Sequence, residues 1–259
     1  MKFDDFDRKM RVYETAADYR ILPGLFMVAR IDSRSFTRLT KQVAKFDVPF
    51  DARFRDMMIV TTKALIQCGF RVIYAYTESD EISLLLDPEE NLFRRKLRKY
   101  NSTLAGEASA QFSVQLGVPA SFDCRISQLP TKQLVVDYFR WRNEDAARNA
   151  LNAWCYWTLR KRGVAQQQAT NQLSGVSTSD KHDLLFEYGI NFNTLPRWQK
   201  RGVGLYWEVF ERTGLNPSTN EPTASRRRRI RVEDELPSKH EYGDFVAQLV
   251  ENRRKQGAA

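Results

Sequence analysis

The sequence predicts an α+β fold built on a ferredoxin-like βαββαβ unit, with an additional, mostly helical C-terminal portion. Short apolar runs alternate with helical patterns in the first part of the chain, and helical patterns dominate the rest. The chain has 259 residues, of which 42% are hydrophobic, and this is enough to bury a substantial core. We therefore place the βαββαβ unit in residues 1–130 and the helical portion, with a basic C-terminal segment, in residues 131–259.

The first strand and first helix are indicated by two different periodicities. Residues 25–31 form a short, nearly all-apolar run that ends in Asp32, as expected of a strand covered on both faces. Residues 51–67 carry apolar side chains at helical spacing and stop before Gly69. A strand followed by a helix opens the unit.

The remaining elements of the unit follow in order. Residues 71–76 and 81–86 are two β-rich runs, and the short polar segment 77–80 between them predicts a tight turn. A helical pattern then extends over residues 88–117, and residues 122–126 form a last short strand candidate. Together these segments complete the βαββαβ order.

Beyond residue 130 the pattern is mainly helical. Residues 134–162 predict a long helix, residues 166–173 and 181–187 predict shorter ones, and residues 202–207 predict a strand. The aromatic side chains of the long helix have a spacing that is more typical of a core than of a base-stacking surface; they are Trp141, Trp154, Tyr156 and Trp157.

The charge of the chain favours a polyanionic partner. It has 41 Lys and Arg against 32 Asp and Glu, which gives a formal net charge of +9, so nucleic acid is the leading class of partner. Residues 226–231, with five arginines, predict either a flexible phosphate-binding arm or a basic strand. No apolar run approaches the length of a membrane span, and the acidic N-terminus does not resemble a signal peptide, so we expect a cytoplasmic protein that does not contact membranes.

The sequence contains few cysteines and histidines, which are the usual soft metal ligands and catalytic nucleophiles or bases. The three cysteines, Cys68, Cys124 and Cys155, lie far apart, and His182 and His240 are the only histidines. Zinc binding, disulfides and catalysis by Cys or His are therefore not expected.

Carboxylates converge at one predicted edge of the sheet. In a split βαβ unit the third strand lies beside the first and antiparallel to it, so Asp32 at the end of the first strand should meet Asp80 and Glu81 at the start of the third. Oxygen ligands alone select a hard cation such as Mg²⁺, which suits phosphoryl transfer from a nucleoside triphosphate. Spacing alone leaves a plainer alternative open, in which Asp32 caps a turn and residues 79–81 build a hairpin.

Several sequence blocks, in a fixed order over about residues 1–210, resemble the signature blocks of the tRNA-His guanylyltransferase superfamily. They are ARIDSRSF (29–36), PFDAR (49–53), YTESDEIS (76–83), FRRK (93–96) with Lys99, FDCR (122–125), YFRWR (138–142), GINFN (189–193) and KRG (200–202). The resemblance implies a polymerase-type palm that adds nucleotides to the 5′ end of tRNA in the 3′ to 5′ direction. The alternatives are untemplated G addition to tRNA-His and a non-catalytic RNA-binding protein with a palm fold, and the intact Asp32 and Asp80 argue against the latter. The resemblance also implies two Mg²⁺ ions, with ATP and GTP or another NTP as substrates, and a homo-oligomer, commonly a tetramer.

The resemblance assigns roles to individual residues. Asp32 and Asp80 would bind the metal ions through their side chains and Ser33 through its backbone carbonyl, with Glu81 beside them in the catalytic set. The family usually has glycine at Ser33, but a carbonyl ligand needs no particular side chain. The triphosphate would be wrapped by backbone N–H groups of residues 33–37, which are Ser33, Arg34, Ser35, Phe36 and Thr37, with Ser79 flanking the metal-binding turn.

The basic segment after the third strand has two readings. The side chains of Arg94, Arg95, Lys96 and Lys99 could form a solvated helix face, but the resemblance favours contacts with triphosphate or RNA phosphate, with Lys99 the strongest candidate for the nucleotide. Asp51 precedes the first helix, where a helix cap explains it without any function.

One departure from the family separates its subgroups. Eukaryotic guanylyltransferases carry an HINNLYN block where this chain reads ARNALNA (147–153), so the histidine is replaced. The DAARN pattern (145–149) instead resembles the bacterial and archaeal guanylyltransferase-like proteins, which the resemblance associates with templated repair of 5′-truncated tRNAs. Arg148, Asn149 and Lys181 are the RNA contacts that it suggests, although an internally bonded amide would explain Asn149 equally well.

Overall fold

In the computed structural model, which describes residues 2–34, 36, 39–40, 44–215 and 222–253, the strands form one antiparallel sheet of six strands. Its strand order is β4-β1-β3-β2-β5-β6. The strands are β1 (Phe26–Ser33), β2 (Val72–Glu78), β3 (Glu81–Leu86), β4 (Phe122–Leu129), β5 (Val203–Leu215) and β6 (Pro222–Glu233). Strands β1 to β4 have the order of a ferredoxin-like unit, which confirms the predicted fold class.

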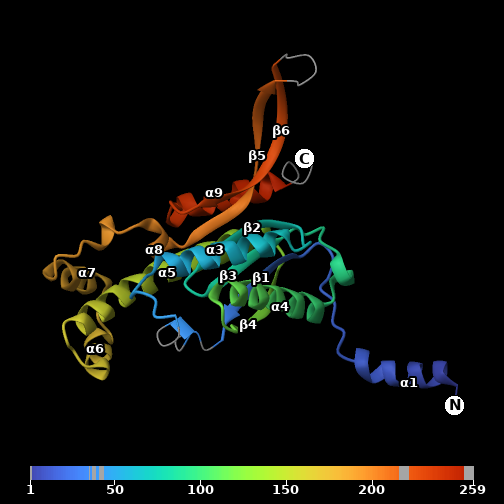
Figure 1. The fold of residues 1–259 in the computed structure, drawn as a ribbon, viewed down its shortest axis with the longest axis horizontal. Coiled ribbons are helices and arrows are strands. Elements are labelled where there is room, and N and C mark those ends of the chain that lie inside the picture. Colours follow the sequence, from blue (N-terminus) through green and yellow to red (C-terminus); the bar gives the residue numbers. More distant parts are fainter. Residues whose placement is uncertain (1, 35, 37–38, 41–43, 216–221, 254–259) are drawn as a thin grey trace.

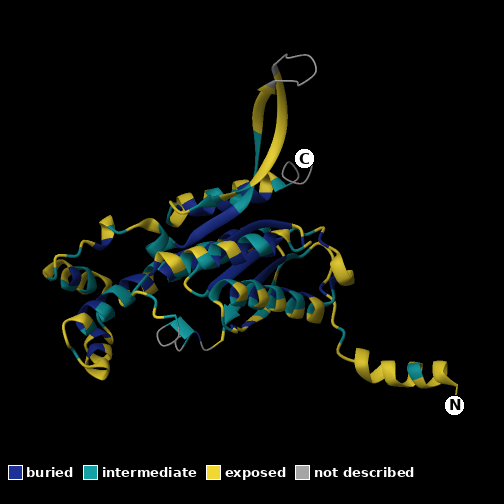
Figure 2. Ribbon diagram, in the orientation of Figure 1, coloured by how far each residue is buried: buried dark blue, intermediate teal, exposed yellow. Residues whose placement is uncertain are grey.

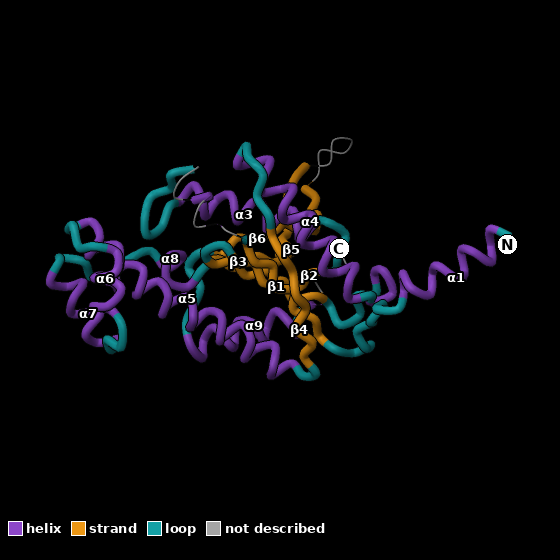
Figure 3. The backbone as a smooth tube through the Cα atoms, turned by 90° about the horizontal axis from the view of Figure 1, so that it is seen from below, coloured by secondary structure: helices purple, strands orange, loops and turns teal. Residues whose placement is uncertain are grey.

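Helices cover both faces of the sheet (Figure 3). One face packs against α3 (Ala52–Gln67) and α4 (Leu97–Leu116), and the other against α5 (Lys132–Lys161) and α9 (Lys239–Glu251). Because side chains alternate along a strand, strands β1 to β5 each contribute to both cores. Burial on both faces explains why residues 26–31 read as an almost continuous apolar run.

The second half of α5 extends beyond the sheet and carries a small helical cluster (Figure 1). This cluster contains α6 (Gln166–Leu173), α7 (Thr178–Glu187), the 3-10 turn η3 (Phe192–Thr194) and α8 (Arg197–Arg201). Its own core packs around the buried Cys155 of α5.

Two elements stand away from the body of the molecule (Figures 1 and 2). The hairpin of β5 and β6 pairs from Gly204 and Glu233 outward, and its distal half is exposed. The N-terminal helix α1 (Phe3–Thr15) buries none of its residues. Behind it, Asp18 accepts hydrogen bonds from Arg98 and Lys96, and these contacts lower the pKa of Asp18 to about 2.

The helix predicted over residues 88–117 begins only at Leu97. The preceding residues form a tight connection that includes the 3-10 turn η2 (Leu92–Arg95). The buried Arg95 guanidinium donates to the carbonyl oxygens of Ile21, Leu25, Pro88 and Glu90, which fixes this connection in place. These long-range hydrogen bonds override the local helical pattern.

The C-terminal portion also differs from the prediction. The strand expected over residues 202–207 extends to Leu215 and pairs with a sixth strand that contains residues 226–231, so the basic segment is a strand. Strand β5 also pairs with β2, which joins this portion to the sheet of residues 1–130. The sequence reading did not identify α1 or α9. None of the described helices has the length and apolar composition needed to span a bilayer.

Candidate active site

The predicted carboxylates meet where β1 ends and β3 begins, which we call the β1–β3 edge. Asp32 lies directly opposite Glu81 on β3 and Asp123 on β4. Asp80 occupies the β2–β3 turn, which closes through a positive φ of 48° at Ser79. The Ser33 hydroxyl donates a hydrogen bond to the Asp80 carboxylate and so ties the end of β1 to this turn. The juxtaposition expected from the split βαβ topology is confirmed.

Arginines surround these acids on the face of the sheet that packs against α5. Glu81 is buried, and both of its oxygens accept from Arg142 at 2.8 Å, while Arg30 approaches one of them at 2.5 Å. Arg30 and Arg125 also approach the Asp32 carboxylate, at 3.4 and 3.2 Å. Glu81 therefore organises the charges of this edge, and its oxygens are already occupied.

The oxygen atoms at the β1–β3 edge suit a hard cation. Asp32, Asp80 and the carbonyl of Ser33 offer oxygen donors only, which is the ligand type that Mg²⁺ prefers. Within the described residues no group of three or more Asp, Glu, His or Cys side chains is arranged so that it could hold a metal ion. The ligand set expected from the sequence therefore stays a prediction.

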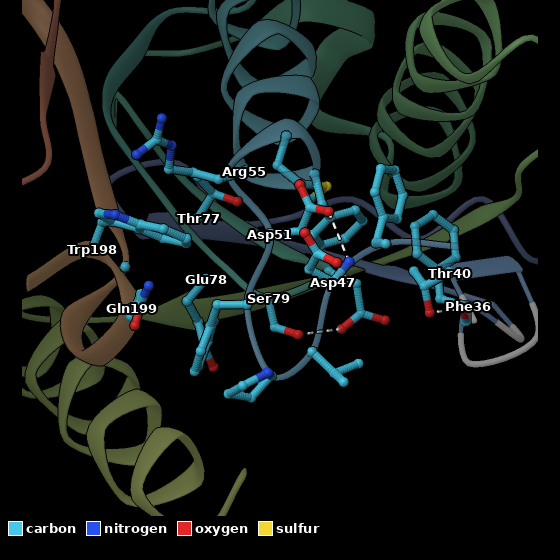
Figure 4. A pocket seen from close by; sticks show the side chains of 18 of the residues that line it. Phe36, Thr40, Asp47, Asp51, Arg55, Thr77, Glu78, Ser79, Trp198 and Gln199 are labelled. Carbon is cyan, nitrogen blue, oxygen red and sulfur yellow. Dashed lines mark hydrogen bonds between the residues drawn. The ribbon is translucent and has the colours of Figure 1, made fainter. Parts of the chain in front are cut away.

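A pocket of about 230 Å³ adjoins the edge on the α3 side, and Ser79 and Asp80 belong to its wall (Figure 4). Its walls combine aromatic rings with acidic groups and the amide of Gln199; the aromatic and acidic residues include Phe36, Phe46, Phe50, Phe54, Trp157, Trp198, Asp47, Asp51 and Glu78. Arg55 lies over the ring of Trp198, 4.7 Å from its centroid. A flat aromatic group would fit between such aromatic walls.

Two acids of the pocket have perturbed pKa values. Hydrogen bonds from Arg53 hold the pKa of Asp51 well below its usual range, and Asp51 also caps α3 through the Arg53 backbone N–H, as the plain reading of this residue predicted. Burial raises the pKa of Glu78 to about 7, and the negative charge of Glu81 adds to this shift.

The residues predicted to wrap the triphosphate are only partly described. Ser35 and Thr37 lie outside the described residues. The backbone N–H of Arg34 donates to the Ser121 carbonyl at 2.8 Å, so in this structure it is not available to a phosphate. Phe36 is buried among other phenylalanine rings and lines the pocket. Ser79 donates to Asp80 at 3.1 Å.

The basic segment near Lys99 lies at the opposite end of the sheet. Arg95 binds the carbonyl of Leu25 just before β1 begins, whereas Asp32 lies near the end of β1, and at about 3.4 Å per residue the strand separates these points by roughly 20 Å. Within one chain, Lys99 therefore does not reach a triphosphate held at the β1–β3 edge, and that prediction needs correction. The physical reason is strand direction: β3 starts at this edge, so the segment that follows β3 starts at the other end.

The predicted RNA contacts in this basic segment also differ from one another. Arg95 is buried and saturated by backbone carbonyls, so its predicted contact with RNA is wrong for this structure. Lys96 is engaged by Asp18 at 2.5 Å, while Arg94 is exposed.

The RNA contacts suggested on α5 and α7 lie apart from one another. Arg148 and Asn149 both bind the Asp145 carboxylate, which Arg142 also contacts at 3.1 Å, so these residues continue the charge network of the β1–β3 edge. Lys181 lies on α7 beside Cys155, farther along α5.

Sequence reasoning missed the arginines that hold the acids in place. Arg30 precedes Asp32 by two residues on the same face of β1, a period-2 relation that could have identified it. Arg142 lies within the YFRWR block, but only the fold shows that it reaches Glu81. Asp123 lies on β4 opposite Asp32 and is exposed.

A ferredoxin-like unit with paired carboxylates at its β1–β3 edge, next to a pocket, defines the class of palm-type nucleotidyltransferases. A family model described as tRNAHis guanylyltransferase matches residues 7–130, and one described as the Thg1 C terminal domain matches residues 133–246. The chain therefore belongs to the tRNAHis guanylyltransferase family and is a nucleotidyltransferase, which confirms the resemblance.

Individual relatives agree with this placement. The chain is 31% identical over 242 residues to a probable tRNA(His) guanylyltransferase of Dictyostelium discoideum, covering 88% of this chain and 93% of that protein. It is 31% identical over 230 residues to the tRNA(His) guanylyltransferase of Debaryomyces hansenii, covering 83% and 86%. Among solved structures, a bacterial tRNA(HIS) guanylyltransferase (Thg1)-like protein in complex with ATP matches with a TM-score of 0.75 and 28% identity, covering 95% of this chain and 99% of that one.

Proposed function

We propose that this protein is a Mg²⁺-dependent enzyme that adds nucleotides to the 5′ end of tRNA in the 3′ to 5′ direction and repairs truncated 5′ ends using the opposite strand as template. ATP would transfer its AMP moiety to the 5′-monophosphate and release pyrophosphate, and the 3′-hydroxyl of an incoming NTP would then attack the activated 5′-phosphate and displace AMP. The observation that carries this proposal is the pairing of Asp32 and Asp80 at one edge of the sheet through Ser33. The neighbour that was solved with ATP, and a related structure described as a complex with GTP, support nucleotides as substrates.

The side chains of the β1–β3 edge have distinct tasks in this proposal. Asp32, Asp80 and the Ser33 carbonyl would hold the cations; Mg²⁺, when bound, neutralises phosphate charge and activates the attacking hydroxyl. The Ser33 hydroxyl orients the Asp80 carboxylate. Arg30 and Arg142 fix Glu81 beside both ligands. The aromatic walls of the pocket would hold the nucleobase and exclude water from it.

The protruding hairpin offers a surface for the phosphates of the RNA. The arginines at residues 226–229 are exposed, with Arg228 over Trp207 and Arg229 over Phe210, so the arms of the hairpin present rigid cations. Replacing Arg226 and Arg227 with Ala should weaken tRNA binding and lower the slope of log Kd against log salt by about one for each phosphate that the variant no longer neutralises. An unchanged slope would show that Arg226 and Arg227 of the hairpin do not contact RNA phosphates.

The central test uses a labelled NTP, Mg²⁺ and a tRNA that lacks its first nucleotide. Asp32→Ala and Asp80→Ala should abolish incorporation without changing the fold, because each removes a cation ligand and little packing volume. Asp244→Ala, which removes an exposed carboxylate from α9, should retain full activity. Wild-type incorporation in either edge variant would show that the metal assignment is wrong.

Templated addition is tested by changing the tRNA base that lies opposite the added nucleotide. The Ala147 position lacks the histidine of the eukaryotic block, and pairing with the opposite strand can reject a wrong base without a guanine-specific protein pocket. Changing the opposing base from C to A should therefore switch the added nucleotide from G to U. Continued addition of G opposite A would instead favour untemplated G addition to tRNA-His.

A further inference from the structure

Trp141 is an exposed tryptophan next to the β1–β3 edge. Its side chain is 54% exposed, whereas the other three members of the same group are partly buried: Trp154 and Tyr156 pack against the core of the helical cluster, and Trp157 lines the pocket. The expectation that these aromatic residues belong to a core is therefore wrong for Trp141. A single exposed aromatic ring is common on protein surfaces, so what distinguishes Trp141 is the way its neighbours hold the ring.

The ring is held in a fixed orientation by its neighbours. The Arg142 guanidinium lies over the Trp141 ring, 4.8 Å from its centroid, and the Tyr138 ring meets it edge-on at 5.7 Å. Arg142 in turn binds Glu81, the residue that follows Asp80. Trp141 is thus connected to the edge through a single side chain, and it is preorganised for stacking.

Cationic and amide groups continue the same surface. Arg148 lies two helical turns after Trp141 on α5, so the two side chains share one face of the helix, and the Arg148 side chain is 78% exposed. Asn149 lies beside Arg148, and both contact Asp145. An aromatic surface with an adjacent cation matches a base and its neighbouring phosphate.

We infer that Trp141 stacks on the terminal base pair of an RNA stem and so positions its 5′ end at the β1–β3 edge, with Arg148 on the adjoining phosphate. This inference rests on the proposed function, because only a reaction at the end of a stem requires the end itself to be held. A stacking surface is independent of base identity, since every base has a π face. It therefore suits an enzyme whose base choice is made by pairing.

The test compares two RNAs by fluorescence polarisation. One is a stem-loop with a paired 5′ end, and the other is a dumbbell with the same stem closed by loops at both ends, so that it has no terminal base pair. Stacking of one base is worth roughly 1–3 kcal/mol, so Trp141→Ala should weaken binding of the stem-loop about 5-fold to 150-fold. Trp141→Phe should retain most of the affinity, and all variants should bind the dumbbell equally.

Further measurements distinguish a role of Trp141 in positioning the RNA from an effect of the substitution on protein stability. Tyr13→Ala, which removes a 72% exposed aromatic ring from α1, is the matched control and should leave both affinities unchanged. ATP affinity and Tm should be the same for Trp141→Ala as for the wild type, because the ring is exposed. A 2-aminopurine placed as the 5′-terminal base should be quenched by the wild type and not by Trp141→Ala.

Two results would overturn the inference: unchanged affinity of Trp141→Ala for the stem-loop, or an equal loss on stem-loop and dumbbell. Failure of the proposed function is distinguishable from either. If the wild type adds no nucleotide to any truncated tRNA, the proposed function fails, while an end-specific loss of binding in Trp141→Ala still supports the stacking surface.

Discussion

Removing the Arg142 side chain should destabilise the protein far more than removing an exposed arginine. The Arg142 side chain is 5% exposed, donates twice to Glu81 at 2.8 Å and contacts Asp145 at 3.1 Å. Breaking a buried ion pair by deleting one partner costs about 3–5 kcal/mol. Because Arg30 remains 2.5 Å from Glu81, we expect the lower end of this range for Arg142→Ala, about 3 kcal/mol.

The assay is thermal unfolding followed by circular dichroism. For a chain of this size, 1 kcal/mol corresponds to about 2–4 °C in Tm, so Arg142→Ala should lower Tm by about 6–12 °C. Arg148→Ala is the matched control, because its exposed pair with Asp145 is worth less than about 1 kcal/mol. The double variant Glu81→Met with Arg142→Met should recover much of the stability, since no charge is then left buried without a partner. Equal Tm values for Arg142→Ala and Arg148→Ala would refute this reasoning.

Three further predictions concern stability. Gly202→Ala should lower Tm clearly, because φ is +69° there and a Cβ would lie 2.6 Å from the Thr77 carbonyl oxygen, whereas Gly214→Ala, with open space around it, should not. The lowered pKa of Asp18 means that its stabilising contribution is complete above about pH 4 and is lost as pH falls toward 2, so Asp18→Asn should reduce Tm at pH 6 and have little effect at pH 2. Deletion of residues 2–15 should leave Tm within about 2 °C, because α1 buries no residue.

The elements that could be predicted from sequence are those specified by local patterns. The run before Asp32 reads as a buried strand because both of its faces are covered, and the polar turn at residues 77–80 marks the hairpin of β2 and β3. Once the order of elements is known, the split βαβ topology places Asp32 opposite Glu81. Strand order and strand direction were therefore enough to predict that these carboxylates lie at one edge of the sheet, on which the metal-binding hypothesis depends.

The elements that could not be predicted depend on contacts between distant segments. Nothing near Arg95 shows that its guanidinium will bind the carbonyls of Ile21 and Leu25, which lie 74 and 70 residues earlier, so the local pattern predicts a helix that runs through it. The role of Arg142 is also hidden from the local sequence, because its partner Glu81 lies 61 residues earlier. Such interactions are tertiary, and they override local propensity where a buried charge has to be neutralised.

Strand direction also explains which residues can act together at the β1–β3 edge. The edge receives the end of β1, the β2–β3 turn and the start of β4, while β3 carries the chain away from it. Residues 94–99 are close to Asp80 in sequence and yet lie at the opposite end of the sheet, where α4 begins. Helix α5, although much later in the chain, passes over the edge and brings Arg142 to Glu81 and Trp141 beside it. Proximity to Asp80 in sequence therefore does not identify the arginines that lie at this edge, whereas the direction of each strand does.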